Sequence, residues 1–272
     1  MARVTRFAPS PTGPLHLGHA YAALVAAERG DRFLLRIEDI DTPRCKPEWE
    51  AAIYEDLHWL GLNWEDPVMR QSTRLPRYRQ ALAALQAQGL TYHCTCTRSD
   101  IRAALSAPQE GAPVVGPDGP VYPGTCRDKG HGEGAIRLDL AVALSRIGEA
   151  AFFDCGTRPG VHVLDKDRMR AEIGDIVLAR RDIGTSYHLA VVIDDADQGI
   201  TEVTRGEDLF EATFLHVLLQ MLLGLPTPSY HHHRLIRDEN GKRLAKRDDA
   251  RALARYRAEG ATPQDIRRMV GL

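Results

Sequence analysis

Short apolar runs alternate with amphipathic stretches through the first ninety residues. Residues 4–8 have the composition of a buried strand, residues 9–14 are rich in Gly and Pro, and an alanine-rich helix is expected from about His16 to Gly30. Residues 32–37 predict a second strand, and residues 47–60 a helix that opens on a proline. A strand that enters a helix through a tight turn is the first unit of a dinucleotide-binding α/β fold.

The pattern changes after residue 90. Residues 186–195 fit either a helix or a strand, because the run is too apolar to show a period. A Pro-, Gly- and Ala-rich stretch of about twenty residues ends at Cys126, and so long a segment without structure needs something to hold it. The other predicted elements are strands at 90–94, 134–140, 151–154, 161–164, 175–180 and 200–205, and helices at 73–88, 99–106 and 207–223.

Composition narrows the class of protein. The chain has 272 residues, 43% of them hydrophobic, and a formal net charge of −2, which argues against a global positive field for nucleic acid. Residues 234–257 nevertheless hold nine Lys or Arg against four Asp or Glu, either a polyanion site or a solvated face. No apolar run is long enough for a bilayer and no leader pattern is visible, so we expect a cytoplasmic protein without membrane contact.

The first candidate site is the tetrad His16-Leu17-Gly18-His19 at the start of the first predicted helix. Two imidazoles three residues apart at a helix N-terminus can donate to the same anion, which suits the phosphates of ATP. Gly18 has no Cβ and would let a flat base lie against the backbone. The alternative is that His16 only caps the helix and His19 is a solvated side chain.

Charged residues follow two predicted strands. Glu38 comes directly after the strand at 32–37, where a carboxylate can hold an ammonium group. Arg205 ends the strand at 200–205, where its guanidinium can bind a carboxylate through two nitrogens. The run His231 to His233 offers at most two rings to one ion, because residues on an extended chain alternate faces.

Three of the five cysteines are spaced as metal ligands. Cys94 and Cys96 form a Cys-x-Cys pair and Cys126 follows the Pro/Gly-rich segment, whereas Cys45 and Cys155 have no partner in this scheme. A closed zinc site needs four ligands. By residue chemistry alone, His131 or His93 ranks above Tyr122 as the fourth, because phenolate is a rare zinc ligand.

The tetrad resembles the HIGH signature of class I aminoacyl-tRNA synthetases, and residues 6–10 resemble the opening of the glutamyl branch. A second signature of that family, a mobile Lys-Met-Ser-Lys-Ser loop, is matched by residues 243–247 with Lys246 as the second lysine. Arg243 replaces the first lysine and keeps its charge, while Ala245 removes a hydroxyl.

The resemblance implies the roles of the site residues. His16, Gly18, His19 and Lys246 would bind ATP, whose phosphates Mg2+ screens, with His16, His19 and Lys246 taking part in the chemistry. Glutamate would lie in a pocket formed by Arg6, Phe7, Ala8, Pro9, Ser10, Glu38, Tyr187 and Arg205.

The metal ligands also follow from the resemblance. In the glutamyl-queuosine branch the site is Cys-x-Cys with a later Tyr-x-x-x-Cys, which implies Cys94, Cys96, Tyr122 and Cys126 around one structural Zn2+. Glutamyl-tRNA synthetases that hold zinc tend to complete the site with a Cys-x-His pair.

The implied fold is α/β, a class I synthetase with a Rossmann-like parallel sheet, a zinc-containing insertion and a short C-terminal helical region that contacts the tRNA stem. Residues 1–90 and 186–225 would form the split catalytic domain, 91–185 the insertion, and 226–272 the second-signature loop and stem-contact region. We expect a monomer.

Only twenty-five residues follow Arg247, too few for the anticodon-binding region of ordinary glutamyl-tRNA synthetases. We therefore expect tRNA-independent activation of L-glutamate by ATP, then transfer to queuosine in the anticodon loop of tRNA(Asp). The alternatives are a truncated enzyme that charges tRNA(Glu), a nucleotidylyltransferase with the same HIGH tetrad, and an inactive tRNA-binding paralogue, which Ala245 keeps open.

Overall fold

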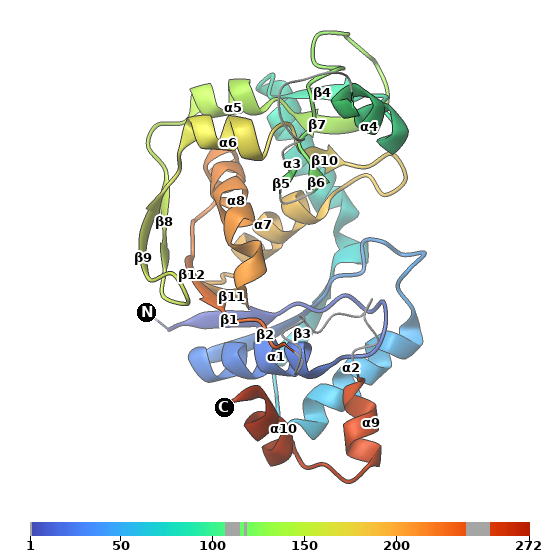
Figure 1. The fold of residues 1–272 in the computed structure, drawn as a ribbon, viewed down its shortest axis with the longest axis vertical. Helices are drawn as coiled ribbons and strands as arrows, with labels where there is room; N and C mark the ends of the chain where they lie inside the picture. The colour runs from blue at the N-terminus through green and yellow to red at the C-terminus, as the bar shows by residue number, and fades with distance from the viewer. Residues whose placement is uncertain (1, 107–114, 117–118, 238–250) are drawn as a thin grey trace.

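The computed structural model describes residues 2–106, 115–116, 119–237 and 251–272 (Figure 1). Lys246 and the rest of the predicted second signature lie outside the described residues. Within them, no helix is both long and apolar enough to cross a bilayer.

The first sheet is parallel and has the order β1-β2-β3. Strands β1 (Val4–Phe7) and β2 (Arg32–Ile37) are the two predicted strands, and helix α1 (Leu17–Arg29) connects them, with α2 (Pro47–Trp59) following β2. Strand β3 (Glu65–Arg70) was not predicted, because its acidic residues and proline disguise an edge strand.

The second sheet has the order β11-β12-β8-β9. Strands β11 (Glu202–Gly206), β12 (Ser229–His233) and β8 (Ala151–Asp154) are parallel, while β9 (Gly160–Val163) runs antiparallel to β8. The backbone N–H of Thr201 donates to the carbonyl of Val4 at 3.0 Å. This bond brings β11 beside β1, so the parallel strands of the two sheets lie side by side (Figure 1).

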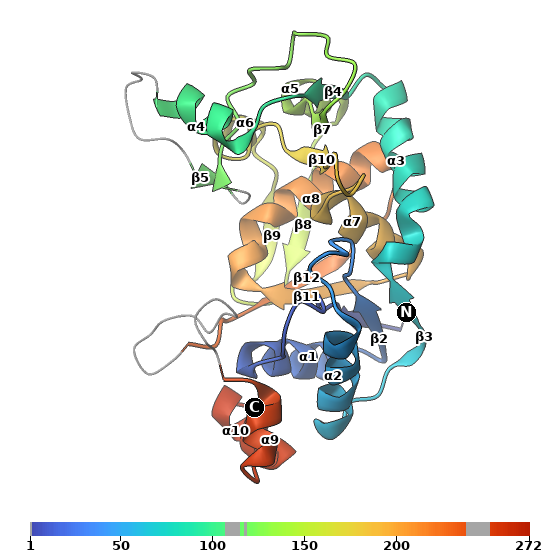
Figure 2. The same cartoon turned by 90° about the vertical axis from the view of Figure 1, so that its right-hand side faces the viewer.

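Two helices pack over the second sheet (Figure 2). Helix α7 (Tyr187–Asp197) resolves the ambiguity at residues 186–195, and Ser186 caps it by accepting from the backbone of Leu189. All residues from His188 to Asp195 are buried, which explains why no amphipathic period was visible. Helix α8 (Phe210–Leu223) follows a 3-10 turn, η2 (Glu207–Leu209), and ends at Gly224.

The predicted insertion contains a small antiparallel sheet of order β10-β7-β4. Strand β8, from the same predicted segment, pairs instead with β12. The domain boundaries remain a prediction. The elements between residues 71 and 180 not yet named are η1 (Gln71–Arg74), α3 (Leu75–Ala87), β4 (Thr91–Cys94), α4 (Arg98–Ser106), β5 (Val115–Gly116), β6 (Gly119–Pro120), β7 (Ala135–Leu138), α5 (Leu140–Arg146), α6 (Lys166–Glu172) and β10 (Val177–Ala179).

The C-terminal helices α9 (Leu253–Ala258) and α10 (Pro263–Val270) pack against α1 and α2 (Figure 2). Leu253 donates its backbone N–H to the carbonyl of Leu15 at 2.8 Å, and Ile266 is fully buried.

The predicted α/β fold with a parallel sheet is confirmed.

Candidate functional site

A cavity of about 1070 Å3 lies where the first sheet, α7 and the predicted insertion meet. Ser10 and Glu38 line it from the ends of β1 and β2, and Tyr187 lines it from the start of α7. The same cavity reaches the cysteine cluster at Cys94 and Cys96. The structure therefore connects the two groups of residues that the sequence singled out separately.

Asp195 binds two buried arginines, and none of these three residues lines the cavity itself. Its Oδ1 accepts from Nε of Arg6 at 2.9 Å and from Nη1 of Arg36 at 2.7 Å, and its Oδ2 accepts from Nη2 of Arg6 at 3.3 Å. Burial opposes the charge of Asp195, but the two guanidiniums prevail and lower its pKa to about 2. The third Arg6 bond goes to the carbonyl of Thr204 at 3.0 Å, so Arg6 links β1, α7 and β11.

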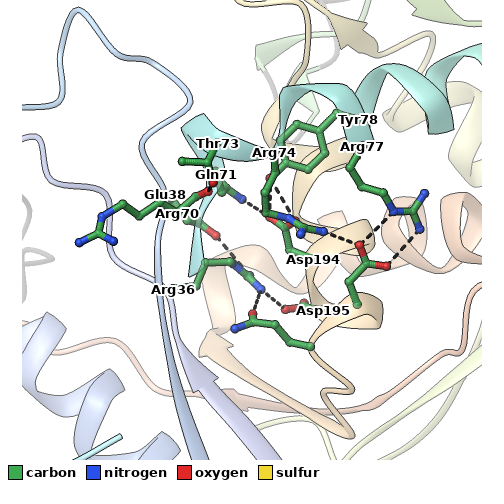
Figure 3. Close-up of polar contacts among 12 residues, drawn as sticks. Arg36, Glu38, Arg70, Gln71, Thr73, Arg74, Arg77, Tyr78, Asp194 and Asp195 are labelled. Carbon is green, nitrogen blue, oxygen red and sulfur yellow. Dashed lines mark hydrogen bonds and ion pairs between the residues drawn. The ribbon is translucent and has the colours of Figure 1, made fainter. Parts of the chain in front are cut away.

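The neighbouring residue, Asp194, faces α3 and η1. It accepts from Gln71 at 2.8 Å, from Nε of Arg74 at 2.7 Å and from the hydroxyl of Tyr78 at 2.8 Å (Figure 3). Adjacent carboxylates on α7 therefore serve two different neighbours.

Glu38 lies at the rim of the same network. Nη2 of Arg36 approaches its Oε1 at 3.4 Å (Figure 3), and 11% of the Glu38 side chain is exposed. Burial raises the pKa of Glu38 despite Arg36 and Arg6. A carboxylate that is desolvated and only weakly paired is suited to accept an ammonium group.

Arg205 is held by neutral groups. Its Nη1 donates to Nδ1 of His216 at 2.8 Å, its Nη2 to Oγ1 of Thr213 at 2.6 Å, and its Nε approaches Nε2 of His232 at 3.3 Å. The residue is 6% exposed. Among the described residues, no carboxylate forms an ion pair with it.

Tyr187 is influenced by both the acidic and the basic groups. Burial and the charge of Glu38 raise the pKa of its hydroxyl, while Arg205 and Arg6 act in the opposite direction. Its ring contacts that of His216, with centroids 5.8 Å apart. Tyr187 thus shares one electrostatic environment with three of the other predicted glutamate-pocket residues.

The opening segment contributes backbone more than side chains. Phe7 is buried in the core and is not part of the cavity lining, while the carbonyl of Pro9 accepts from the backbone N–H of Glu38 at 3.0 Å. Pro9 is buried, Ala8 is half-buried, and Ser10 lines the cavity. The turn therefore fixes Glu38 relative to β1.

His16 and His19 form a capping box. The backbone N–H of Gly18 donates to Nδ1 of His16 at 3.1 Å, and that of His16 donates to Nδ1 of His19 at 3.2 Å. Their ring centroids are 3.8 Å apart. Because each Nδ1 accepts a bond, a neutral ring carries its proton on Nε2. Capping and anion binding are thus compatible, since the cap orients the Nε2–H donors.

Gly18 is required beside this pair. A Cβ at that position would lie 3.0 Å from Cε1 of His16, which is tighter than ordinary contact. The glycine therefore leaves room for the His16 ring as well as for any ligand above it.

Three thiols converge at the far end of the cavity. The Sγ atoms of Cys94, Cys96 and Cys126 all lie within 4.8 Å of one another. Burial opposes ionisation of Cys126, yet hydrogen bonds from Tyr122 and neighbouring groups lower its pKa to about 5. Three sulfur ligands at this separation fit a tetrahedral Zn2+ site that lacks one ligand.

Tyr122 reaches the thiols directly. Its hydroxyl lies 3.4 Å from Sγ of Cys94 and 3.5 Å from Sγ of Cys96, and it accepts from the backbone N–H of Cys126 at 2.9 Å. The His131 ring instead lies 3.4 Å from Oγ1 of Thr95.

Comparison with known proteins identifies the family. The pattern described as "tRNA synthetases class I (E and Q), catalytic domain" matches residues 3–117 and 163–272. A protein named glutamyl-Q tRNA(Asp) synthetase from Rhodobacter capsulatus is 61% identical over 99% of this chain and 100% of its own length. One of the same name from Nocardia farcinica is 42% identical over 96% of this chain and 81% of its own. The chain belongs to the class I tRNA synthetases, in the glutamyl-Q tRNA(Asp) synthetase group.

A solved structure supports the fold of this class I synthetase. The crystal structure of a glutamate-tRNA synthetase from Elizabethkingia anophelis superposes with a TM-score of 0.78 at 28% identity. The superposition covers all of this chain and 61% of that chain, so the chain spans less than two thirds of that solved enzyme.

Several residues of the synthetase site were not found from the sequence. Asp195, Arg36 and Thr213 had no assigned role, and the packing of His216 and His232 around Arg205 was not foreseen. One signal was available: polar side chains within otherwise apolar segments, such as His216 in the helix at 207–223, are buried only with partners.

Proposed function

We propose that this chain activates L-glutamate with ATP, without tRNA, and then transfers the glutamyl group to queuosine in the anticodon loop of tRNA(Asp). The observation that carries the proposal is Arg205, a buried guanidinium whose acceptors in the described part of the chain are all neutral. It is suited to receive the side-chain carboxylate, while Glu38, which acts on the same Tyr187 hydroxyl, takes the ammonium group.

The first step joins glutamate and ATP. The glutamate α-carboxylate attacks the α-phosphorus, a P–O bond forms, and pyrophosphate leaves as the bond to the β-phosphate breaks. His16 and His19 donate Nε2–H bonds to the phosphates, an interaction that strengthens as charge develops on them. Mg2+ bound to ATP would screen the charge of the phosphates. Lys246 takes the second lysine role of the family and lies outside the described residues.

The second step uses the adenylate. A hydroxyl of the queuosine cyclopentene ring attacks the acyl carbon, a C–O bond forms as the bond from the acyl carbon to the phosphate oxygen breaks, and AMP leaves with the hydroxyl proton on its phosphate. No side chain is needed as a covalent nucleophile, so catalysis consists of positioning and charge neutralisation. The partners are therefore ATP, L-glutamate and tRNA(Asp) that carries queuosine, and the acting species is a monomer.

A structural Zn2+, one per chain, would be held by Cys94, Cys96, Cys126 and Tyr122. The three thiols and the phenol offer four donors at one end of the cavity. When bound, the metal would fix the loop that carries Tyr122 against β4.

The deciding experiment supplies labelled glutamate and ATP with total tRNA that contains or lacks queuosine. Label only on queuosine-containing tRNA(Asp) is the expected result. Label on tRNA(Glu) irrespective of queuosine would make the chain a tRNA(Glu)-charging enzyme. Absence of glutamate-dependent pyrophosphate exchange would indicate an inactive paralogue. Unchanged exchange in Lys246→Ala would remove that lysine from the first step.

A further inference from the structure

Arg6, Arg36 and Arg205 are all buried, but among the described residues only the first two form ion pairs. Arg6 and Arg36 pair with Asp195, and Arg36 also approaches Glu38. Arg205 takes no share of these charges. A buried cation without a counter-ion is destabilising, so the fold must hold Arg205 by other means.

The groups that hold it are uncharged and come from two elements. Thr213 and His216 lie one turn apart on α8, and His232 lies on β12. Each accepts from, or approaches, a different nitrogen of the guanidinium. The three contacts fix the plane of Arg205 without neutralising it.

Asp154 determines which way the His232 ring presents its lone pair. Oδ1 of Asp154 contacts Nδ1 of His232 at 2.8 Å and accepts from its backbone N–H at 3.0 Å. The proton is therefore on Nδ1, and Nε2 accepts from Oγ1 of Thr213 at 3.0 Å and faces Arg205. Burial and Arg205 lower the pKa of His232 to about 4, so the ring is neutral at pH 7.

His216 is oriented in the same manner. Its Nδ1 accepts from Arg205, so its proton lies on Nε2, which contacts Nδ1 of His188 at 2.9 Å. Burial and the adjacent Arg205 lower the pKa of His216 well below its usual range. Both rings thus act as acceptors that add no charge.

The Asp154 carboxylate itself is occupied elsewhere. Its Oδ2 accepts from the backbone N–H groups of Gly156 at 3.2 Å and Arg158 at 3.1 Å. Gly156 packs so closely on β12 that a Cβ there would meet the carbonyl oxygen of His232 at 2.0 Å. The carboxylate therefore orients the histidine from behind while its own hydrogen bonds are satisfied by backbone.

We infer that Thr213, His216 and His232 are positioning residues that hold Arg205 with neutral acceptors alone, and that this neutral shell sets the selectivity for glutamate over glutamine. The inference rests on the proposed function. A carboxylate ligand supplies the missing counter-charge, whereas the isosteric amide of glutamine does not. If a shell residue carried a negative charge, Arg205 would be neutralised and the preference would disappear.

The test measures binding of glutamate and of glutamine by calorimetry, without ATP. His216→Gln and His216→Glu form a matched pair, because they have the same shape and only the second places a carboxylate near Arg205. We expect the wild type and His216→Gln to prefer glutamate, and His216→Glu to lose about 100-fold in glutamate affinity. Met221→Glu places the charge on the exposed face of α8 and should change glutamate affinity less than about threefold.

A second pair guards against misfolding of His216→Glu, which thermal melting would reveal. Thr213→Val keeps the shape but removes an acceptor of Arg205, and should weaken glutamate binding by about tenfold, with Thr213→Ser restoring it. Wild-type glutamate affinity in folded His216→Glu, or in Thr213→Val, would overturn the inference and leave the proposed function intact. A wild type that binds no glutamate would overturn both.

Discussion

Asp195 and Arg6 form a two-point ion pair between residues 189 positions apart, with Nε to Oδ1 at 2.9 Å and Nη2 to Oδ2 at 3.3 Å. Both side chains are more than nine-tenths buried. Arg36 binds the same Oδ1. One carboxylate therefore links β1, β2 and α7.

Removal of that charge should unfold the protein more easily. We expect Asp195→Asn to lower the free energy of unfolding by about 3–5 kcal/mol at pH 7, because two buried guanidiniums lose their partner. Urea unfolding, monitored by circular dichroism, measures this free energy. Glu65→Gln, which breaks the exposed pair with Arg32, is the control and should leave the free energy of unfolding nearly unchanged. Similar losses in both variants would contradict the assignment.

Asp195 also predicts a pH dependence. Its folded pKa, about 2, lies below the ordinary value of 3.8, so its stabilisation is fully present above about pH 4 and is lost as the pH falls toward 2. The wild type should lose more stability than Asp195→Asn between pH 4.5 and pH 2.5. Equal slopes of unfolding free energy against pH would show that Asp195 is not the group that titrates.

The charge of Arg205 should affect the binding of glutamate and not that of ATP. Arg205→Gln is expected to raise the KM for glutamate by about 100-fold or more and to leave the KM for ATP within about twofold. Arg205→Lys should lie between, because an ammonium group cannot reach three acceptors in a fixed fork. Pyrophosphate exchange at varied glutamate and ATP gives both constants, and a parallel rise in the two would indicate general damage.

The two roles of His16, helix capping and phosphate binding, can be tested separately. Asn is a good helix N-cap but has no ring N–H, so His16→Asn should keep the melting temperature and lower the rate of pyrophosphate exchange by about 100-fold. His16→Ala should lose both the cap and the exchange activity, and its free energy of unfolding should fall by about 1 kcal/mol. Full activity of His16→Asn would leave His16 as a cap alone.

The zinc content of two variants distinguishes between the candidates for the fourth ligand. Tyr122→Phe should lower the zinc bound per chain after dialysis against a weak chelator, whereas His131→Ala should keep about one equivalent. Elemental analysis of purified protein gives the numbers. The reverse result would replace Tyr122 by His131 in the ligand set.

Site residues could be predicted where a residue of suitable chemistry stands at the end of a predicted strand or in a predicted turn. The turn after β1, Glu38 at the end of β2 and Arg205 within β11 were named because strand ends collect ligands in parallel sheets. The clustering of the three cysteines likewise followed from their spacing. In these cases the residue type and the element boundary are both encoded within a few positions.

The supporting residues were not predictable by the same reasoning. The bonds of Asp195 to Arg6 and Arg36 span more than 150 positions, and nothing in residues 186–195 shows which carboxylate faces which neighbour. Strand β3 and helix α7 were missed or ambiguous because one is polar at an edge and the other is buried on all sides. Tertiary contact, not local preference, decides these cases.

Successive residues on a helix point about 100° apart, and α7 uses this rotation to address two neighbours at once. Asp194 is bonded to α3 and η1, and Asp195 to the first two strands. The rotation of this one helix about its axis thus sets the directions of both carboxylates. Deletion of one residue upstream in α7 would turn both carboxylates away from their partners together, so the length of this helix and the two networks it supports depend on each other.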